Sequence, residues 1–160
     1  PQTDNYTQPD RTCFSSTCAM AVFQSGKPIS SDDEYLRKVL QIGDTTNPNV
    51  QLQVLQSYGL KVRYSQSLGF TDLDAQLGKG KCIPIGILHR GTASAPTGGH
   101  WIVIVGKEGQ NYIVLDPYGT VIDGYTSDVN NGNKARYSTA LLAQRWTAEG
   151  GNSGWGIIID

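Results

Sequence analysis

The chain has 160 residues and a mass of 17.3 kDa, a length that predicts one domain spanning residues 1–160. Its 13 basic and 14 acidic side chains give a net charge of −1, which argues against nucleic acid or an anionic membrane as a partner. The longest apolar runs have the length of strands, so we expect no membrane-spanning segment. Pro1 stands where a complete chain would have a methionine, so we expect that a segment preceding it has been removed.

Helical patterns fill the first half of the chain. Residues 1–12 are polar and aperiodic, and we expect an extended lead-in there. Helices are then predicted over residues 13–25, over residues 32–42 with a cap at Ser30 or Ser31, and over residues 48–58 with a start at Asn47. A brief helix over residues 72–77 is predicted to be capped by Thr71.

Strand patterns dominate the second half. We expect strands over residues 61–64, 82–89, 101–105, 112–115 and 154–159. Residues 117–133 are expected to be irregular, and a capped amphipathic helix is predicted over residues 138–146. Because helices come first and strands later, the sequence predicts an α+β domain and not an alternating parallel fold.

Residues 98–118 are predicted to form an antiparallel hairpin with a three-residue loop that ends at Gly109. That register would set His100 directly opposite Asp116, with Cβ atoms about 5 Å apart. A loop of two or four residues would place them on opposite faces of the sheet. A carboxylate that holds an imidazole fixes its tautomer and stabilises its charged form, so the pair predicts the orienting half of a nucleophilic site. A histidine and an Asp-Pro step are also common where strands simply begin and end.

The three cysteines, Cys13, Cys18 and Cys82, cannot all form disulfides, so we expect a free thiol. Cys13 is the predicted first residue of the first helix, where backbone amides and the helix dipole lower the pKa of a thiol. Cys18 and Cys82 are expected to be small buried residues. Cys13 is therefore the candidate nucleophile that would complete the site with His100 and Asp116.

The sequence favours no metal and no cofactor. The cysteines and histidines lack the paired spacing of a zinc site. Residues 123–133 are rich in carboxylate and amide oxygens that calcium could bind, but their spacing does not match an EF-hand loop and ordinary turns are expected. His89 ends a strand beside Arg90 without a carboxylate in the local register, so it is expected to be a surface residue.

Four segments occur in a recognisable order: residues 2–5 (QTDN), 13–20 (CFSSTCAM), 98–101 (GGHW) and 116–117 (DP). Together they resemble the papain-like cysteine peptidases related to the bacteriocin-processing (double-glycine leader) peptidases. More closely, they look like the cell-wall-directed branch of that group, as in phage and bacterial lysins. The resemblance covers nearly the whole chain and implies a papain-like fold with N-terminal helices packed on a C-terminal antiparallel sheet. The chain departs from the pattern in lacking an extended strand before the glutamine and in carrying Cys18 in the same helix.

The resemblance implies that Cys13 is the nucleophile, that His100 is the general base and acid, and that Asp116 is the orienting carboxylate. It also implies a glutamine that, with the backbone N–H of Cys13, stabilises the oxyanion. Gln2 is preferred because it lies in the family-like QTDN segment, although Gln8 is nearer to Cys13 in sequence.

The implied function is a cysteine peptidase that forms an acyl-enzyme, with peptidoglycan as the expected substrate. We expect a monomer that is secreted or associated with the cell wall or a phage. Three alternatives stay open: a leader-peptide or protein-processing peptidase, a transpeptidase in which an amine takes the acyl group, and a peptide-binding module without catalysis. A glycopeptide groove could be lined by aromatic side chains, namely Trp101, Tyr118, Tyr125, Trp146 and Trp155.

Overall fold

The computed structural model describes residues 12–92, 94–123, 125 and 132–160, and its centre is a six-stranded antiparallel sheet. The spatial order is β1, β8, β2, β5, β6, β7, so the strand that comes last in the chain lies between β1 and β2. The strand bounds are Val62–Leu68 (β1), Ile83–Ile87 (β2), His100–Glu108 (β5), Asn111–Leu115 (β6), Asn133–Ser138 (β7) and Gly154–Ile159 (β8).

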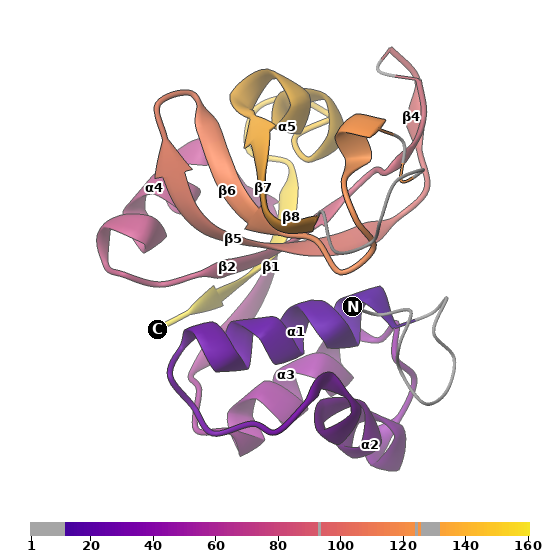
Figure 1. Cartoon of the computed structure of the whole chain (residues 1–160), viewed down its shortest axis with the longest axis vertical. Helices are drawn as coiled ribbons and strands as arrows, with labels where there is room; N and C mark the ends of the chain where they lie inside the picture. The colour runs from indigo at the N-terminus through magenta and orange to yellow at the C-terminus, as the bar shows by residue number, and fades with distance from the viewer. Residues whose placement is uncertain (1–11, 93, 124, 126–131) are drawn as a thin grey trace.

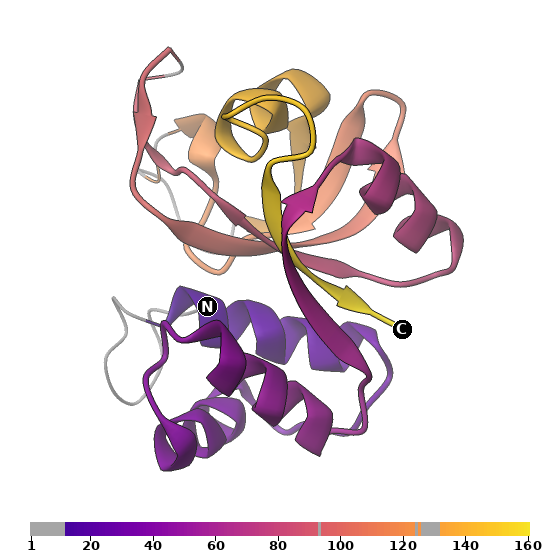
Figure 2. The ribbon, with the colours of Figure 1, turned by 180° about the vertical axis from the view of Figure 1, so that it is seen from behind.

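Helices cover both faces of this sheet, as Figure 1 and the reverse view in Figure 2 show. On one face lie α1 (Cys13–Gln24), α2 (Asp32–Ile42) and α3 (Pro48–Ser57), with α1 directly against the strands. On the other face lie α4 (Phe70–Gly78) and α5 (Thr139–Arg145). The predicted α+β class, with N-terminal helices packed on an antiparallel sheet, is confirmed. No described helix is both long enough and apolar enough to cross a bilayer.

The sheet separates two apolar cores, and β5 contributes to both. Ile102 and Ile104 pack into the cluster that includes residues of α4 and α5, whereas Val103 packs into the cluster that includes α1. Alternate residues of a strand point to opposite faces, so each face of this central strand is buried. This arrangement explains why residues 101–105 are continuously apolar in the sequence.

The predicted helix starts are mostly confirmed. Backbone N–H groups in the first turns donate to the side chains of Ser31 (α2), Asn47 (α3) and Ser138 (α5). The start of α4 was predicted wrongly. This helix begins at Phe70, before the predicted cap Thr71, and the Asp72 carboxylate accepts a hydrogen bond from the N–H of Gly69 at 2.8 Å. A carboxylate within the first turn thus takes the place of a hydroxyl cap.

Several short elements were not predicted. They are β7, the two-stranded ribbon of β3 (Arg90–Gly91) and β4 (Pro96–Thr97), and one turn of 3₁₀ helix over Val121–Asp123. In β7, Tyr137 is buried and Ala135 is half-buried, while the other residues are mainly polar and exposed. Pairing with β6, and not apolar composition, makes this segment a strand.

The hairpin of β5 and β6 has a shorter loop than predicted. Glu108 pairs with Asn111, so the loop has two residues, and Gly109 supplies the positive φ of 61° that such a turn requires. With this loop alone, His100 and Asp116 would lie on opposite faces of the sheet.

A β-bulge at Val105 restores the shared face. The bulge inserts one extra residue into β5, so that Val103 pairs with Leu115. Extending this register puts Asp116 diagonally across from His100, not directly opposite it as predicted. The loop shifts the register by three residues from the predicted one and the bulge moves it back by one. The net shift of two residues is even, so the expectation that the two side chains share a face holds.

The contact between α5 and β8 gives a test of this packing. In Gly154→Ala, the new Cβ would overlap the ring of Trp146, which is buried and cannot swing aside. We expect the free energy of unfolding to fall by about 1–3 kcal/mol, as for other overpacked sites. Thermal and urea denaturation measure it. The matched control is Gly78→Ala at the end of α4, where no atom lies within 4 Å of the new Cβ and stability should be unchanged or slightly higher. Equal stability of the two variants would contradict this packing.

Candidate active site

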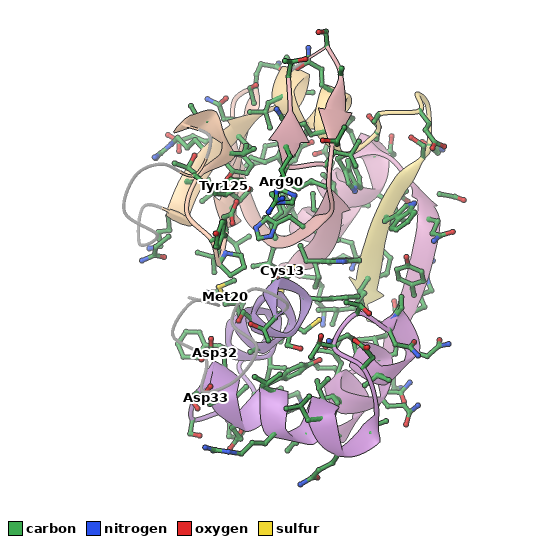
Figure 3. The ribbon with its side chains drawn as sticks, turned by 90° about the vertical axis from the view of Figure 1, so that its right-hand side faces the viewer. Cys13, Met20, Asp32, Asp33, Arg90 and Tyr125 are labelled. Carbon is green, nitrogen blue, oxygen red and sulfur yellow. The ribbon has the colours of Figure 1, made fainter. Side chains whose placement is uncertain are left out.

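Cys13 is the first residue of α1 and lies on the side of that helix that faces the sheet (Figure 3). The start of a helix carries a partial positive charge from its unpaired amide groups, which favours a thiolate. Cys13 is a free cysteine, as are Cys18 and Cys82. Cys18 is fully buried in the core and Cys82 is nearly so, as the sequence predicted.

The pKa of the Cys13 thiol is lowered by its surroundings. Burial on its own would raise this pKa, but the hydrogen bond and the positive charge of His100 oppose it. Hydrogen bonds from the backbone N–H groups of Trp101 and Phe14 favour the thiolate further, so the net shift is downward. Cys18 differs, because burial dominates there and raises the pKa of its thiol. The structure therefore distinguishes one reactive thiol from an inert one in the same helix.

Two contacts dock α1 on β5 beside the thiol. The ring of Phe14 stacks on Trp101 with centroids 3.8 Å apart and planes within 5°. One turn along the helix, the hydroxyl of Thr17 donates a hydrogen bond of 2.7 Å to the backbone oxygen of Trp101. Since Phe14 follows Cys13 and Trp101 follows His100, these contacts set the position of the thiol relative to the imidazole.

His100 and Asp116 form a short, buried pair. Nε2 of His100 lies 2.6 Å from Oδ1 of Asp116, and the two residues are only 3% and 4% exposed. Burial alone would lower the pKa of His100, but the charge and hydrogen bond of Asp116 and the neighbouring Cys13 raise it to about 9. A raised imidazole pKa beside a lowered thiol pKa favours a thiolate–imidazolium pair at neutral pH.

Three further donors hold the Asp116 carboxylate. The N–H of Tyr118 donates to Oδ1 at 3.0 Å, and the hydroxyls of Tyr125 and Tyr137 donate to Oδ2 at 2.8 Å and 2.6 Å. Tyr137 was not predicted to belong to the site, and Tyr125 was predicted to line a substrate groove instead. The alternation of apolar and charged residues around Tyr137 indicates a strand with Tyr137 on one face, but it does not indicate the contact of the hydroxyl with Asp116.

His89 was wrongly predicted to be a surface residue. Its ring is half-buried and lies 5.3 Å from the ring of His100 and 5.9 Å from that of Tyr125. Burial, together with the nearby charges of His100 and Arg90, lowers the pKa of His89 to about 4. A neutral His89 therefore adds no second positive charge to the site at neutral pH. Local sequence could not show this, because the neighbours of His89 come from other elements.

A cleft of about 350 Å³ borders His100. Its lining includes Trp101, Trp146 and Trp155, which are three of the five aromatic residues predicted for a groove, whereas Tyr118 and Tyr125 are not among the residues that line it. Trp155 is half exposed, whereas Trp146 is buried and donates its indole N–H to the backbone oxygen of Trp155 at 3.0 Å. Arg145 and Glu149 also line the cleft, which is otherwise mainly apolar. A mainly apolar cleft with a few polar groups is typical of ligand-binding sites.

Solved structures of other proteins share this architecture. No protein-family model and no curated protein sequence matches the chain. A solved structure described as a C39-like peptidase from Bacillus anthracis shares 12% identity and a TM-score of 0.62, over 94% of this chain and 89% of that one. The peptidase domain of Streptococcus ComA, a bifunctional ABC transporter involved in a quorum sensing pathway, shares 18% identity and a TM-score of 0.60, over 94% and 91%. The chain has the fold of the C39-like peptidases.

The C39-like fold agrees with the papain-like fold that the sequence resemblance implied. Some residues named from the sequence lie outside those that the structure describes: Gln2 and Gln8, the candidates for the oxyanion donor, and most of residues 123–133, where ordinary turns were expected in preference to a calcium site. Within the described part of the C39-like fold, no group of three or more His, Cys, Asp or Glu side chains is arranged to hold a metal ion.

The thiol chemistry of this site can be tested without a substrate. At pH 7 we expect iodoacetamide to modify Cys13 and to spare Cys18 and Cys82, because burial raises the pKa of the latter two thiols. In His100→Ala the thiolate loses its charged partner, and the rate should fall about tenfold or more. Mass spectrometry of peptides gives the rates. His89→Ala is the control and should react like the wild type, and labelling of Cys18 in the native protein would contradict the assignment.

Proposed function

We propose that this chain is a cysteine peptidase in which Cys13 is the nucleophile, His100 the general base and acid, and Asp116 the orienting carboxylate. The observation that carries the proposal is the thiol at a helix start beside an imidazole whose other side is held by a buried carboxylate at 2.6 Å. Acyl transfer by cysteine requires an activated thiolate and a proton carrier in the correct tautomer. The C39-like fold supports the same class of enzyme.

In this mechanism the Cys13 thiolate attacks the carbonyl carbon of an amide bond. Nε2 of His100 is bonded to Asp116, so Nδ1 is the nitrogen that gives its proton to the leaving amine as the C–N bond breaks. The thioester that forms is then attacked by a water molecule, which neutral His100 deprotonates, and the acid product leaves with Cys13 restored. The backbone N–H of Cys13 and the side chain of Gln2 are the proposed donors to the oxyanion.

For the substrate we propose the stem peptides or cross-links of peptidoglycan. The resemblance to the cell-wall-directed branch supports this class, as does the tryptophan-lined cleft beside His100. The proposal includes a monomeric enzyme that is secreted or associated with the cell wall or a phage. A second candidate is a leader-peptide processing peptidase, which is favoured by the likeness to the peptidase domain of the transporter ComA.

Digestion assays separate these substrates. We expect the wild type to release muropeptides with new termini from purified peptidoglycan, and Cys13→Ala to release none, with products identified by mass spectrometry. Cys18→Ala is the matched control, because it removes a thiol of the same helix that lies in the core and should retain most of the activity. Cleavage of a leader-peptide library without muropeptide release would favour the second candidate. Products that carry a new amide would indicate transpeptidation, and full activity of Cys13→Ala would overturn the proposal.

The pH dependence follows from the paired charges. The pKa of Cys13 is lowered, so its thiolate takes up a proton only at a pH below the usual range of a thiol. The imidazolium of His100 loses its proton as the pH rises through its pKa of about 9. We therefore expect a bell-shaped profile of kcat/KM. In Asp116→Asn the charge that raises the His100 pKa is gone, so the alkaline limb should move to lower pH and the rate should fall at least about tenfold. Thermal denaturation checks folding, and an unmoved alkaline limb in the folded variant would contradict the role of Asp116.

A further inference from the structure

The orientation of a carboxylate beside a histidine is not fixed by its own torsion angle. Rotation about χ2 of an aspartate is soft, so neighbouring donors decide which oxygen faces which partner. For Asp116 the donors are divided by oxygen: Oδ1 faces His100 and the N–H of Tyr118, and Oδ2 faces the hydroxyls of Tyr125 and Tyr137. Both oxygens are therefore held, and exchanging them would break contacts on both sides.

Tyr137 is itself fixed. It is fully buried on β7, where its backbone pairs with Tyr112 of β6. Its hydroxyl accepts a hydrogen bond of 2.8 Å from the N–H of Val121, so the single hydroxyl proton is directed to Oδ2 of Asp116. Burial and the charge of Asp116 raise the pKa of Tyr137, which keeps this hydroxyl protonated as a donor.

Tyr125 adds a second donor from another direction. Its hydroxyl reaches Oδ2 at 2.8 Å, and its ring lies 5.5 Å from that of His100 in an edge-to-face arrangement. Figure 3 shows Tyr125 above the start of α1, on the same side as Cys13. Tyr125 thus touches the carboxylate and the imidazole that the carboxylate orients.

We propose that Tyr137 is a positioning residue that holds the Asp116 carboxylate in the orientation in which Oδ1 faces His100. Tyr125 is a second positioning residue that holds the same Oδ2 atom as Tyr137. This inference rests on the proposed function, because it gives both tyrosines a role in the peptidase reaction. They act through Asp116 and neither is proposed to form a bond with the substrate.

The hydroxyls of Tyr125 and Tyr137 affect the charge of the Asp116 carboxylate as well as its orientation. Each hydroxyl that donates to Oδ2 withdraws part of the negative charge that would otherwise act on His100. Removing one hydroxyl leaves the carboxylate more basic, so the imidazolium should persist to higher pH. This shift is opposite in sign to the one expected for Asp116→Asn, and a purely structural role for Tyr137 would not produce it.

The test uses NMR titration of the imidazole resonances, which is practical because the chain has only two histidines. In Tyr137→Phe and Tyr125→Phe we expect the His100 titration to move up by about half a pH unit or more. We expect kcat to fall about tenfold with little change in KM, as for loss of a hydrogen bond to a charged group. The alkaline limb of the activity profile should move up with the titration.

The matched control is Tyr112→Phe. Tyr112 lies in the same sheet and its hydroxyl also donates to an aspartate, Oδ1 of Asp74 at 2.7 Å, but that carboxylate is on the surface. This variant should leave the His100 titration and kcat unchanged. If Tyr137→Phe does not fold, Tyr125→Phe alone decides the result.

A His100 titration that coincides with the wild type in the folded Tyr137→Phe and Tyr125→Phe variants would overturn the inference, whatever their melting temperatures. The failure of the proposed function is seen separately. A wild type that cleaves no peptide would refute the peptidase, while the titration would still report whether the tyrosines control the Asp116–His100 pair.

Discussion

The contact between α1 and β5 decides whether this site exists. The thiol of Cys13 belongs to the helical layer and the imidazole of His100 to the sheet, so neither layer contains both groups. The stacked rings of Phe14 and Trp101 join the two layers one residue beyond Cys13 and His100. A hydrogen bond from Thr17 then fixes the helix along the strand. Close-packed side chains cannot adjust freely to a displacement. A shift of about a few tenths of an ångström in this interface would therefore change the distance between the Cys13 sulfur and the His100 ring nitrogen by a similar amount.

Behind that interface lies an electrostatic constraint. A buried carboxylate is costly unless its charge is paired and its oxygens are hydrogen-bonded. Asp116 meets this condition with four donors, of which one is the imidazole. The thiolate at the helix start is likewise stabilised by backbone amides and by the positive charge of His100. The three groups depend on one another, so removing one changes the protonation of the others.

Local signals in the sequence predicted the helices apart from the start of α4, whereas the other features that were missed depend on tertiary contacts. Caps such as Ser31 and Asn47 act on their own first turn, so the sequence contains the whole interaction. The bulge at Val105 leaves no such pattern. His100 and Asp116 share the predicted face because the loop and the bulge together shift the register by an even number of residues. The role of Tyr137 arises from residues far away in the chain and could not be predicted from its own segment.

The position of β8 has a consequence for the order of assembly. This strand, residues 154–159, lies between β1 and β2 and contributes Ile157 and Ile159 to the core that includes α1. During synthesis Cys13 leaves the ribosome first, and the strand that completes the layer beneath its helix leaves last of the described strands. Non-local pairing of this kind is slow and comes late in folding. The core that supports the helix of Cys13 would therefore be complete only after the last described strand of the sheet has been translated.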